Sequence, residues 1–196
     1  AFEAFVYFVY RDGKGLKGDI KKQYESLLEQ EETRALYFMF GHYLPTFYFR
    51  DEEWFGGLLP QIFPDERNEE HLYLAAWEGY LANKLYQDIF FDPNFQDLYE
   101  RSIEGVAEIK QKEDHRQFFK DPEERTADHL ALAHMYFEDF DKDHSLFELF
   151  LSKGSIKQHA RFISFLGRHF VTNLNESAED LLETKGWPAI TRWIWC

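Results

Sequence analysis

Cysteine is almost absent from this sequence, and the single one, Cys196, is the last residue. One thiol can form neither an internal disulfide nor a cysteine-rich zinc site. A reducing compartment suits such a chain, so we expect a cytoplasmic protein. The 196 residues are enough for one domain whose core needs neither a disulfide nor a metal to be stable.

Long apolar runs are also lacking. The longest extends over seven residues, from Ala4 to Tyr10, whereas a membrane-spanning helix needs about twenty. The first residues contain no basic segment and no small-residue cleavage site of the kind that marks a signal peptide. We therefore expect no membrane insertion.

Basic residues are scarce relative to acidic ones, with 22 Lys and Arg against 36 Asp and Glu and a net charge of −14. The excess of acid lies within residues 1–140, because residues 141–196 contain seven groups of each sign. Such a field repels phosphate backbones and anionic lipid surfaces. We expect neither nucleic acid nor a membrane as a partner, and no cofactor.

Residues that favour strands are few, and no stretch alternates apolar and polar positions. The apolar positions instead recur at steps of three and four, as on helices. Ile156, Ala160, Ile163, Gly167 and Phe170 form one such stripe. The pattern predicts an all-α fold of about ten helices, at 2–11, 18–31, 34–49, 51–62, 68–90, 93–109, 122–139, 145–152, 155–172 and 177–195.

Several predicted boundaries rest on specific residues. Asp121-Pro122 and Asp92-Pro93 each combine an N-cap carboxylate with a proline at the first helical position. Pro45 should kink or break the third helix, and Pro188 the last one, because proline lacks the amide that a helix interior requires. Gly154 follows a helical run and suits a left-handed C-terminal residue.

Aromatic residues are what the chain has in abundance, with 5 Trp, 11 Tyr and 21 Phe. Rings at helical spacing are typical of a packed core. Part of the pattern repeats after 37 residues, where Phe40 and Tyr43 correspond to Trp77 and Tyr80. This spacing is that of a helix pair in a repeat protein. We expect antiparallel helix pairs, arranged as a HEAT-like α-solenoid or as an irregular bundle.

Both ends of the sequence are apolar, at 2–10 and at 187–195. Natural domain ends are usually polar. The chain is therefore interpreted as one helical domain, 1–196, cut from a larger protein, with a possible seam at the charged stretch 110–121. Its helix pairs and apolar ends resemble the helical regions of large multidomain proteins.

Candidate metal ligands are weak. His129 and His134 are five residues apart, so they point about 140° away from each other on a helix. His134 and Glu138 have the correct helical spacing but supply only two ligands. Residues 139–150 begin like a calcium loop, with acids at the first, third and fifth positions, but His144 and Phe150 replace the glycine and the glutamate that such a loop needs.

A basic stripe is the only patterned cationic surface of the sequence, formed by Lys153, Lys157, Arg161 and Arg168. It suits a phosphate or an acidic partner segment. Alternatively, it pairs with the acidic stripe of the following predicted helix, which consists of Glu176, Glu179, Asp180 and Glu183.

The sequence favours a non-catalytic interaction, scaffold or regulatory module, which binds a protein partner or a neighbouring domain of the same polypeptide. The expected binding residues are Lys153, Lys157, Arg161, Arg168, Trp193 and Trp195. Two alternatives stay open. One is a small metal-dependent helical enzyme that uses His129, His134 and nearby carboxylates. The other is a homo-oligomer that associates through its aromatic ends.

Overall fold

The computed structural model describes residues 6, 16–65, 69–112, 121–138, 140 and 145–173, and within these ranges the secondary structure is helical without strands. The prediction of an all-α fold is confirmed. The helices are α2 (Gly18–Gln30), α3 (Arg34–His42), α4 (Leu44–Arg50), α5 (Glu52–Ile62), α6 (Glu70–Leu81), α7 (Gln87–Phe90), α8 (Pro93–Lys112), α9 (Pro122–Tyr136), α10 (Ser145–Lys153) and α11 (Ile156–Asn173).

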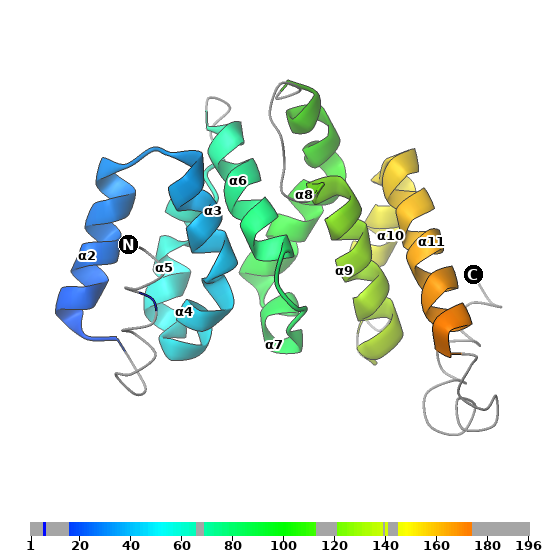
Figure 1. The fold of residues 1–196 in the computed structure, drawn as a ribbon, viewed down its shortest axis with the longest axis horizontal. Helices are drawn as coiled ribbons and strands as arrows, with labels where there is room; N and C mark the ends of the chain where they lie inside the picture. Colours follow the sequence, from blue (N-terminus) through cyan, green and yellow to red (C-terminus); the bar gives the residue numbers. More distant parts are fainter. Residues whose placement is uncertain are drawn as a thin grey trace.

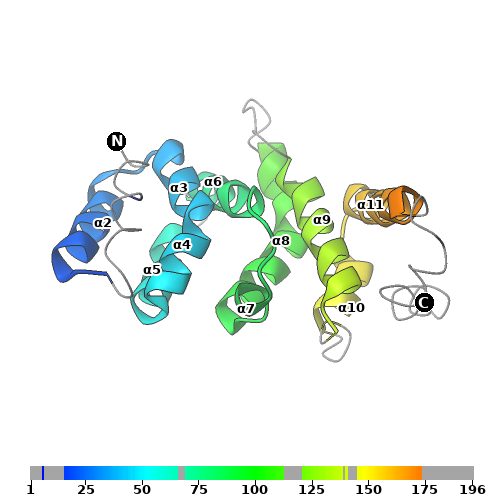
Figure 2. The same cartoon turned by 60° about the horizontal axis from the view of Figure 1, so that its bottom comes forward.

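The helices are arranged in an elongated row. Figure 1 shows α3, α6, α9 and α11 side by side along the long axis, and each of them contacts the next. Helices α5, α8 and α10 pack on the other side of this row (Figure 2). The short helices α4 and α7 connect longer ones and interrupt the regular alternation of helix pairs. The choice between a regular solenoid and an irregular bundle therefore stays a prediction.

Helix starts follow the predicted capping chemistry. The Asp121 side chain accepts a hydrogen bond from the Glu123 amide at 3.1 Å, and Asp92 accepts one from the Asn94 amide at 2.9 Å. Both carboxylates satisfy amides that have no partner within the helix. Pro45 lies in the first turn of α4, directly after a break at Tyr43, so the predicted interruption is confirmed.

Two predicted helix ends and one predicted cap conformation are wrong. The helix predicted at 68–90 ends at Leu81, because the Asn83 amide donates to the carbonyls of Gly79 and Tyr80 and satisfies the last turn. The helix predicted at 122–139 ends at Tyr136, where the backbone becomes extended at Phe137. Gly154 does follow α10, but its φ is not left-handed. Glycine is required there because a Cβ would approach the Phe150 carbonyl oxygen to 2.5 Å.

Helices α3 and α6 pack against each other at two glycines, Gly41 and Gly79. A Cβ added at Gly41 would clash with the carbonyl oxygen of Ala76, and one added at Gly79 would clash with that of Phe38. The two glycines therefore let the two backbones come into direct contact. This contact fixes α3 against α6 in the centre of the row.

Aromatic residues fill the core, as the sequence predicts, and several polar groups within it form hydrogen bonds with one another. The Trp77 indole donates to the hydroxyl of Ser102 at 2.8 Å, and Ser102 shares a hydrogen bond of 2.7 Å with Thr126. These three residues belong to α6, α8 and α9, so one buried network connects three helices. In the part of the chain that the structure describes, none of the helices has an apolar stretch long enough to cross a bilayer.

Candidate functional site

Helix α11 lies at one end of the row of described helices (Figure 1), and its first turn carries a reciprocal capping box. The Gln158 amide donates to the Ser155 hydroxyl at 3.1 Å, and the Gln158 side chain accepts from the Ser155 amide at 2.8 Å. Phe162 and Leu166 are buried on the same side of the helix as Gln158. This inner side attaches α11 to the rest of the molecule.

The basic stripe occupies a second side of α11, and two of its members are paired with α9. The Arg161 guanidinium donates two hydrogen bonds to the Asp128 carboxylate, at 2.6 and 2.8 Å. The Lys157 ammonium lies 2.5 Å from Asp121 and 3.5 Å from Glu124. These contacts connect the first two turns of α11 to α9.

The hydrogen bonds among Arg161, Lys157 and their carboxylate partners favour the ionised form of these groups. The hydrogen bond to Asp128 raises the pKa of Arg161. Burial opposes ionisation of Lys157, but its hydrogen bond to Asp121 outweighs that effect and raises the Lys157 pKa. Burial likewise opposes ionisation of Asp121, whose pKa is nevertheless lowered by hydrogen bonds from Lys110 and Lys157. At neutral pH all of these groups are therefore charged.

The other two predicted members of the basic stripe are exposed. Lys153 is the last residue of α10 and Arg168 lies near the end of α11, where its guanidinium donates to the Ser164 carbonyl at 3.3 Å. The acidic residues expected to face the stripe, Glu176, Glu179, Asp180 and Glu183, lie outside the described residues. So do the predicted binding residues Trp193 and Trp195.

A third side of α11 is apolar and points to solvent. Ile156 is 89% exposed and Ile163 is 58% exposed, and Ala160 and Gly167 continue the same exposed line. The apolar stripe from which the sequence predicts this helix is therefore exposed. A different set of residues, including Phe162 and Leu166, attaches the helix to the core. We call these four residues, Ile156, Ala160, Ile163 and Gly167, the outer stripe.

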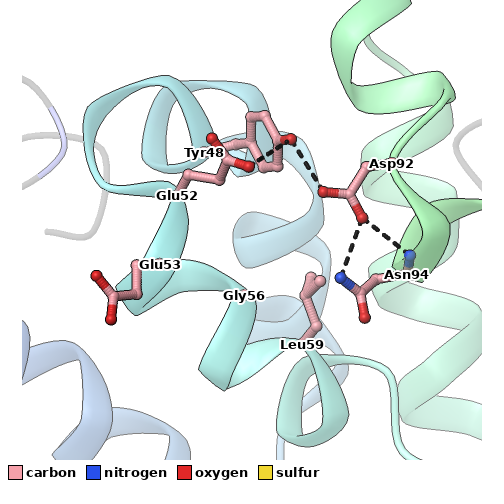
Figure 3. Close-up of a pocket in the computed structure, with 7 residues that line it drawn as sticks. All are labelled: Tyr48, Glu52, Glu53, Gly56, Leu59, Asp92 and Asn94. Carbon is pink, nitrogen blue, oxygen red and sulfur yellow. Dashed lines mark hydrogen bonds between the residues drawn. The ribbon is translucent and has the colours of Figure 1, made fainter.

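A small acidic pocket lies between α4, α5 and the start of α8, with a volume of about 420 Å³ (Figure 3). The Tyr48 hydroxyl lies 3.0 Å from an Asp92 oxygen and 3.2 Å from a Glu52 oxygen, while Asn94 donates to Asp92. Burial, together with these carboxylates, raises the pKa of Tyr48, so the phenol stays protonated. Tyr48, Glu52, Asp92 and Asn94 are thus engaged with one another, and their contacts connect α4, α5 and α8.

The predicted metal ligands do not converge. His129 is buried among α6 and α8, where its Nδ1 lies 2.8 Å from the Tyr99 hydroxyl. His134 is buried on another side, with its ring stacked on Phe147 at a centroid distance of 5.3 Å. Glu138 is exposed and lies beyond the end of α9, so the helical spacing to His134 is not realised.

No three His, Cys, Asp or Glu side chains within the described ranges gather where they could hold a metal ion. Burial lowers the pKa of His129 from 6.5 to about 4, so its imidazole is neutral at pH 7. The three acidic positions of the calcium-like loop and His144 fall on 139, 141, 143 and 144, and most of the predicted seam falls on 113–120. Both segments lie outside the described residues.

Comparison with known proteins gives no relative from which a function can be transferred. No protein-family model matches the chain, and neither a curated protein nor a solved structure matches it significantly. A function for this protein therefore has to be inferred from its own sequence and structure.

The sequence predicts the basic stripe of α11 but not the exposure of the apolar stripe beside it. The signal that separates the two apolar sides is the capping box Ser155–Gln158, because the buried Gln158 marks the inner side. Within the described residues, Ile156 and Ile163 of the outer stripe have the largest exposed fractions of all large apolar side chains, and they lie beside the basic stripe.

Proposed function

We propose that this chain is a non-catalytic helical interaction module of a larger protein. It binds a protein partner, or a neighbouring domain of the same polypeptide, through the outer stripe of α11 and the basic residues beside it. The single observation that carries the proposal is the exposure of Ile156 and Ile163 on one line of α11. The single cysteine supports a cytoplasmic location.

Covering the apolar surface of the outer stripe would supply most of the binding free energy. Covering an exposed isoleucine completely contributes about 1.5–3 kcal/mol. Two of them on one helical stripe, with the small residue Ala160 between them and Gly167 after them, offer a partner both apolar area and room for close approach. Contiguous exposed apolar surface of this kind is typical of protein interaction sites.

The charges beside the outer stripe favour an acidic partner. Helix α11 contains no Asp or Glu, although the chain as a whole has a net charge of −14. Arg161 is held by Asp128, while Lys153 and Lys157 keep part of their surface in solvent. Such rim charges chiefly accelerate association and select the partner, whereas the apolar contact supplies most of the affinity.

The test compares partner binding by the purified wild-type chain, one double variant and one single control variant. Proteins captured by the wild type are identified, purified and measured directly against Ile156→Asp/Ile163→Asp. We expect the affinity to fall about a hundredfold, which corresponds to about 2.7 kcal/mol. The matched control is Phe49→Asp, which removes another exposed apolar residue far along the row, on α4 (51% exposed), and should leave the affinity unchanged.

Salt dependence provides an independent readout. Lys153→Glu should slow association at low ionic strength and have little effect at high ionic strength, because exposed charges act within the Debye length. If every captured partner binds Ile156→Asp/Ile163→Asp as tightly as it binds the wild type, the outer stripe is not an interface and the proposal is wrong.

A further inference from the structure

We propose that the outer stripe of α11 also binds the outer stripe of a second copy of this chain, as an antiparallel pair of helices related by a two-fold axis. This inference rests on the proposed function in one respect, because it takes the outer stripe as a binding surface. It goes further by naming an occupant of that surface. The dimer excludes an external partner from the stripe for as long as it lasts.

The outer stripe points away from the rest of the described molecule. Successive residues of a helix are about 100° apart, so the four members of the stripe lie within about 60° of one another. The residues that attach α11 to α9 and to the core, from Lys157 to Leu166, spread over the opposite half of the helix. Helix α11 lies at the end of the row (Figure 1), so a second molecule can approach the stripe from outside the row.

Large and small residues alternate along the stripe in a self-complementary order. The order is Ile156, Ala160, Ile163 and Gly167, with steps of four, three and four, as in the seam between two packed helices. If two copies run antiparallel, with the axis between positions 161 and 162, Ile156 faces Gly167 of the second copy and Ala160 faces Ile163 of the second copy. Each of the four layers then combines one isoleucine with one small residue. A two-fold axis requires such reciprocal pairs.

A parallel pair fits the same stripe badly. It would set isoleucine against isoleucine and small residue against small residue, so wide and narrow layers would alternate along two straight helices. The antiparallel pair has a uniform width and uses space that the single chain leaves open, because a Cβ added at Gly167 would have no neighbour within 4 Å. The order of residues therefore favours the antiparallel arrangement.

The charges at this end of the molecule permit a second copy to approach. The excess of acid lies within residues 1–140, whereas residues 141–196 contain seven groups of each sign. A two-fold axis brings the two basic stripes to the same edge of the contact. At that edge Lys157 lies 2.5 Å from Asp121, and Arg161 donates two hydrogen bonds to Asp128. Each copy thus neutralises these two cations itself, which limits the repulsion between the copies.

One helix from each copy makes a small interface. Contacts that bury less than about 1,200 Å² in total are typical of weak, dissociable complexes. We therefore expect a dissociation constant on the order of 10–100 µM and no permanent dimer. Such a dimer dissociates when the protein is diluted or when a tighter partner is present.

Sedimentation equilibrium of the full chain measures this association, over protein concentrations from well below to well above the expected dissociation constant. All proteins carry Cys196→Ser, which prevents disulfide-linked dimers. Ile156→Asp/Ile163→Asp should be monomeric throughout, whereas Phe49→Asp should dimerise like the wild type. A wild-type chain that stays monomeric at every concentration overturns the inference, and so does a dimer that the two aspartates leave intact.

An exchange of two stripe residues tests the antiparallel pairing itself. Ala160→Ile sets two isoleucines against each other in the central layers, and Ile163→Ala sets two alanines there, so each change alone should weaken dimerisation about tenfold or more. The exchange Ala160→Ile/Ile163→Ala restores one large and one small residue in each layer. Its dissociation constant should return to within about threefold of the wild-type value. Additive losses in the exchanged variant would overturn the pairing. Both positions are exposed in the single chain, and circular dichroism checks that the variants stay folded.

Disulfide trapping reports the orientation of the two helices. Positions 156 and 167 are eleven residues apart, or about 16.5 Å along α11, whereas a disulfide needs Cα atoms within about 7 Å. An oxidised mixture of Ile156→Cys and Gly167→Cys proteins should therefore form the mixed disulfide, while neither protein alone forms a disulfide with itself. Self-linkage of Ile156→Cys would indicate a parallel pair and contradict the proposed arrangement.

The two proposals fail separately, because sedimentation is measured on the isolated protein and the proposed function is tested with a captured partner. A chain that is always monomeric, together with a partner that depends on Ile156 and Ile163, would leave the proposed function standing without the inference. A dimer that depends on the stripe, together with captured partners that ignore these isoleucines, would restrict the stripe to self-association. If both hold, raising the concentration of the chain should weaken its apparent affinity for the external partner.

Discussion

Arg161 on α11 and Asp128 on α9 form a two-point contact, in which the guanidinium donates hydrogen bonds of 2.6 and 2.8 Å to both carboxylate oxygens. Asp128 is only 1% exposed, so its charge depends on this partner and on Arg125 at 3.2 Å. The contact therefore locks the end helix to the row and sets the direction in which the outer stripe points.

Removing this guanidinium should destabilise the protein. Arg161→Ala leaves a buried carboxylate with one remaining cation, and we expect the free energy of unfolding to fall by about 3 kcal/mol. Arg161→Lys should recover only part of this loss, since an ammonium cannot bind both oxygens in the same plane. Urea denaturation measures both, with the exposed Lys153→Ala as the control, which should change stability by less than about 0.5 kcal/mol.

A result in which Arg161→Ala and Lys153→Ala are equally stable would contradict this account. It would mean that Arg125 alone compensates the Asp128 carboxylate. The double variant Arg125→Ala/Arg161→Ala would then be required to expose the cost of the buried charge.

Stability should depend on the ionisation of His129. Burial and the nearby Arg125 cation lower the pKa of this imidazole from 6.5 in the unfolded chain to about 4 in the folded protein. Between these two values the unfolded chain binds the proton and the folded protein does not. Stability is therefore complete above pH 6.5 and decreases as the pH falls towards 4, by about 3 kcal/mol in total.

Urea denaturation at intervals between pH 7.5 and pH 4 measures this effect. His129→Gln keeps an acceptor for the Tyr99 hydroxyl but has no titrating group, so its stability should change much less over the same range. Asp121 does not confuse the result. Its lowered pKa makes a contribution that is lost only at more acidic pH, below the range in which His129 titrates. Parallel pH profiles of the two proteins would refute the assignment to His129.

The glycines at the α3–α6 contact should not tolerate a methyl group. Gly41→Ala and Gly79→Ala each direct a Cβ at a backbone carbonyl, which cannot move aside as a side chain can. We expect each to lower the free energy of unfolding by about 1–3 kcal/mol or more. Thermal unfolding followed by circular dichroism would measure the change.

Gly105 in α8 is the matched control, because a Cβ there has no neighbour within 4 Å. Gly105→Ala should stabilise the protein by about 0.5–1 kcal/mol, since alanine restricts the unfolded chain and favours the helix. The opposite signs of the two changes distinguish a steric conflict from a general effect of the substitution. If Gly41→Ala were as stable as Gly105→Ala, the close approach of α3 and α6 would be wrong.

Much of the fold could be predicted because its signals are local. Asp92 and Asp121 cap helices through amides two residues away, and Pro45 interrupts the helical backbone at its own position. The end of α6 was missed since Asn83 acts there as a C-terminal cap, a role with a weak sequence signal compared with glycine. Local chemistry therefore determined which segments are helical, and less reliably where they end.

The candidate site on α11 could not be predicted in full, because it depends on contacts between residues far apart in the sequence. Helix α11 has apolar residues on two sides, Phe162 and Leu166 on one and Ile156 and Ile163 on the other, and periodicity cannot decide which side is buried. The partner of Arg161 is 33 residues away, and the acidic stripe expected for it lies outside the described residues. Only the packing of α9 against α11 shows which groups meet.

The contact between Tyr48 and Asp92 should join α4 to α8 with a measurable coupling energy. The Tyr48 hydroxyl is 3.0 Å from an Asp92 oxygen, and Asp92 also caps α8 through the Asn94 amide. Tyr48→Phe leaves the cap in place but removes the Asp92 contact together with the 3.2 Å contact to Glu52, and it should cost about 1.5 kcal/mol, the range of hydrogen bonds to charged groups. Asp92→Ala removes both contacts and should cost about 1 kcal/mol more, which is the typical value of a helix cap. In the double variant the Tyr48 contact is counted once, so a coupling energy of about 1 kcal/mol should appear in urea denaturation of the four proteins.

Asp92→Asn separates the two roles because its amide oxygen can still cap Asn94. It should therefore lose less stability than Asp92→Ala, and additive effects of Tyr48→Phe and Asp92→Ala would show that the phenol donates elsewhere.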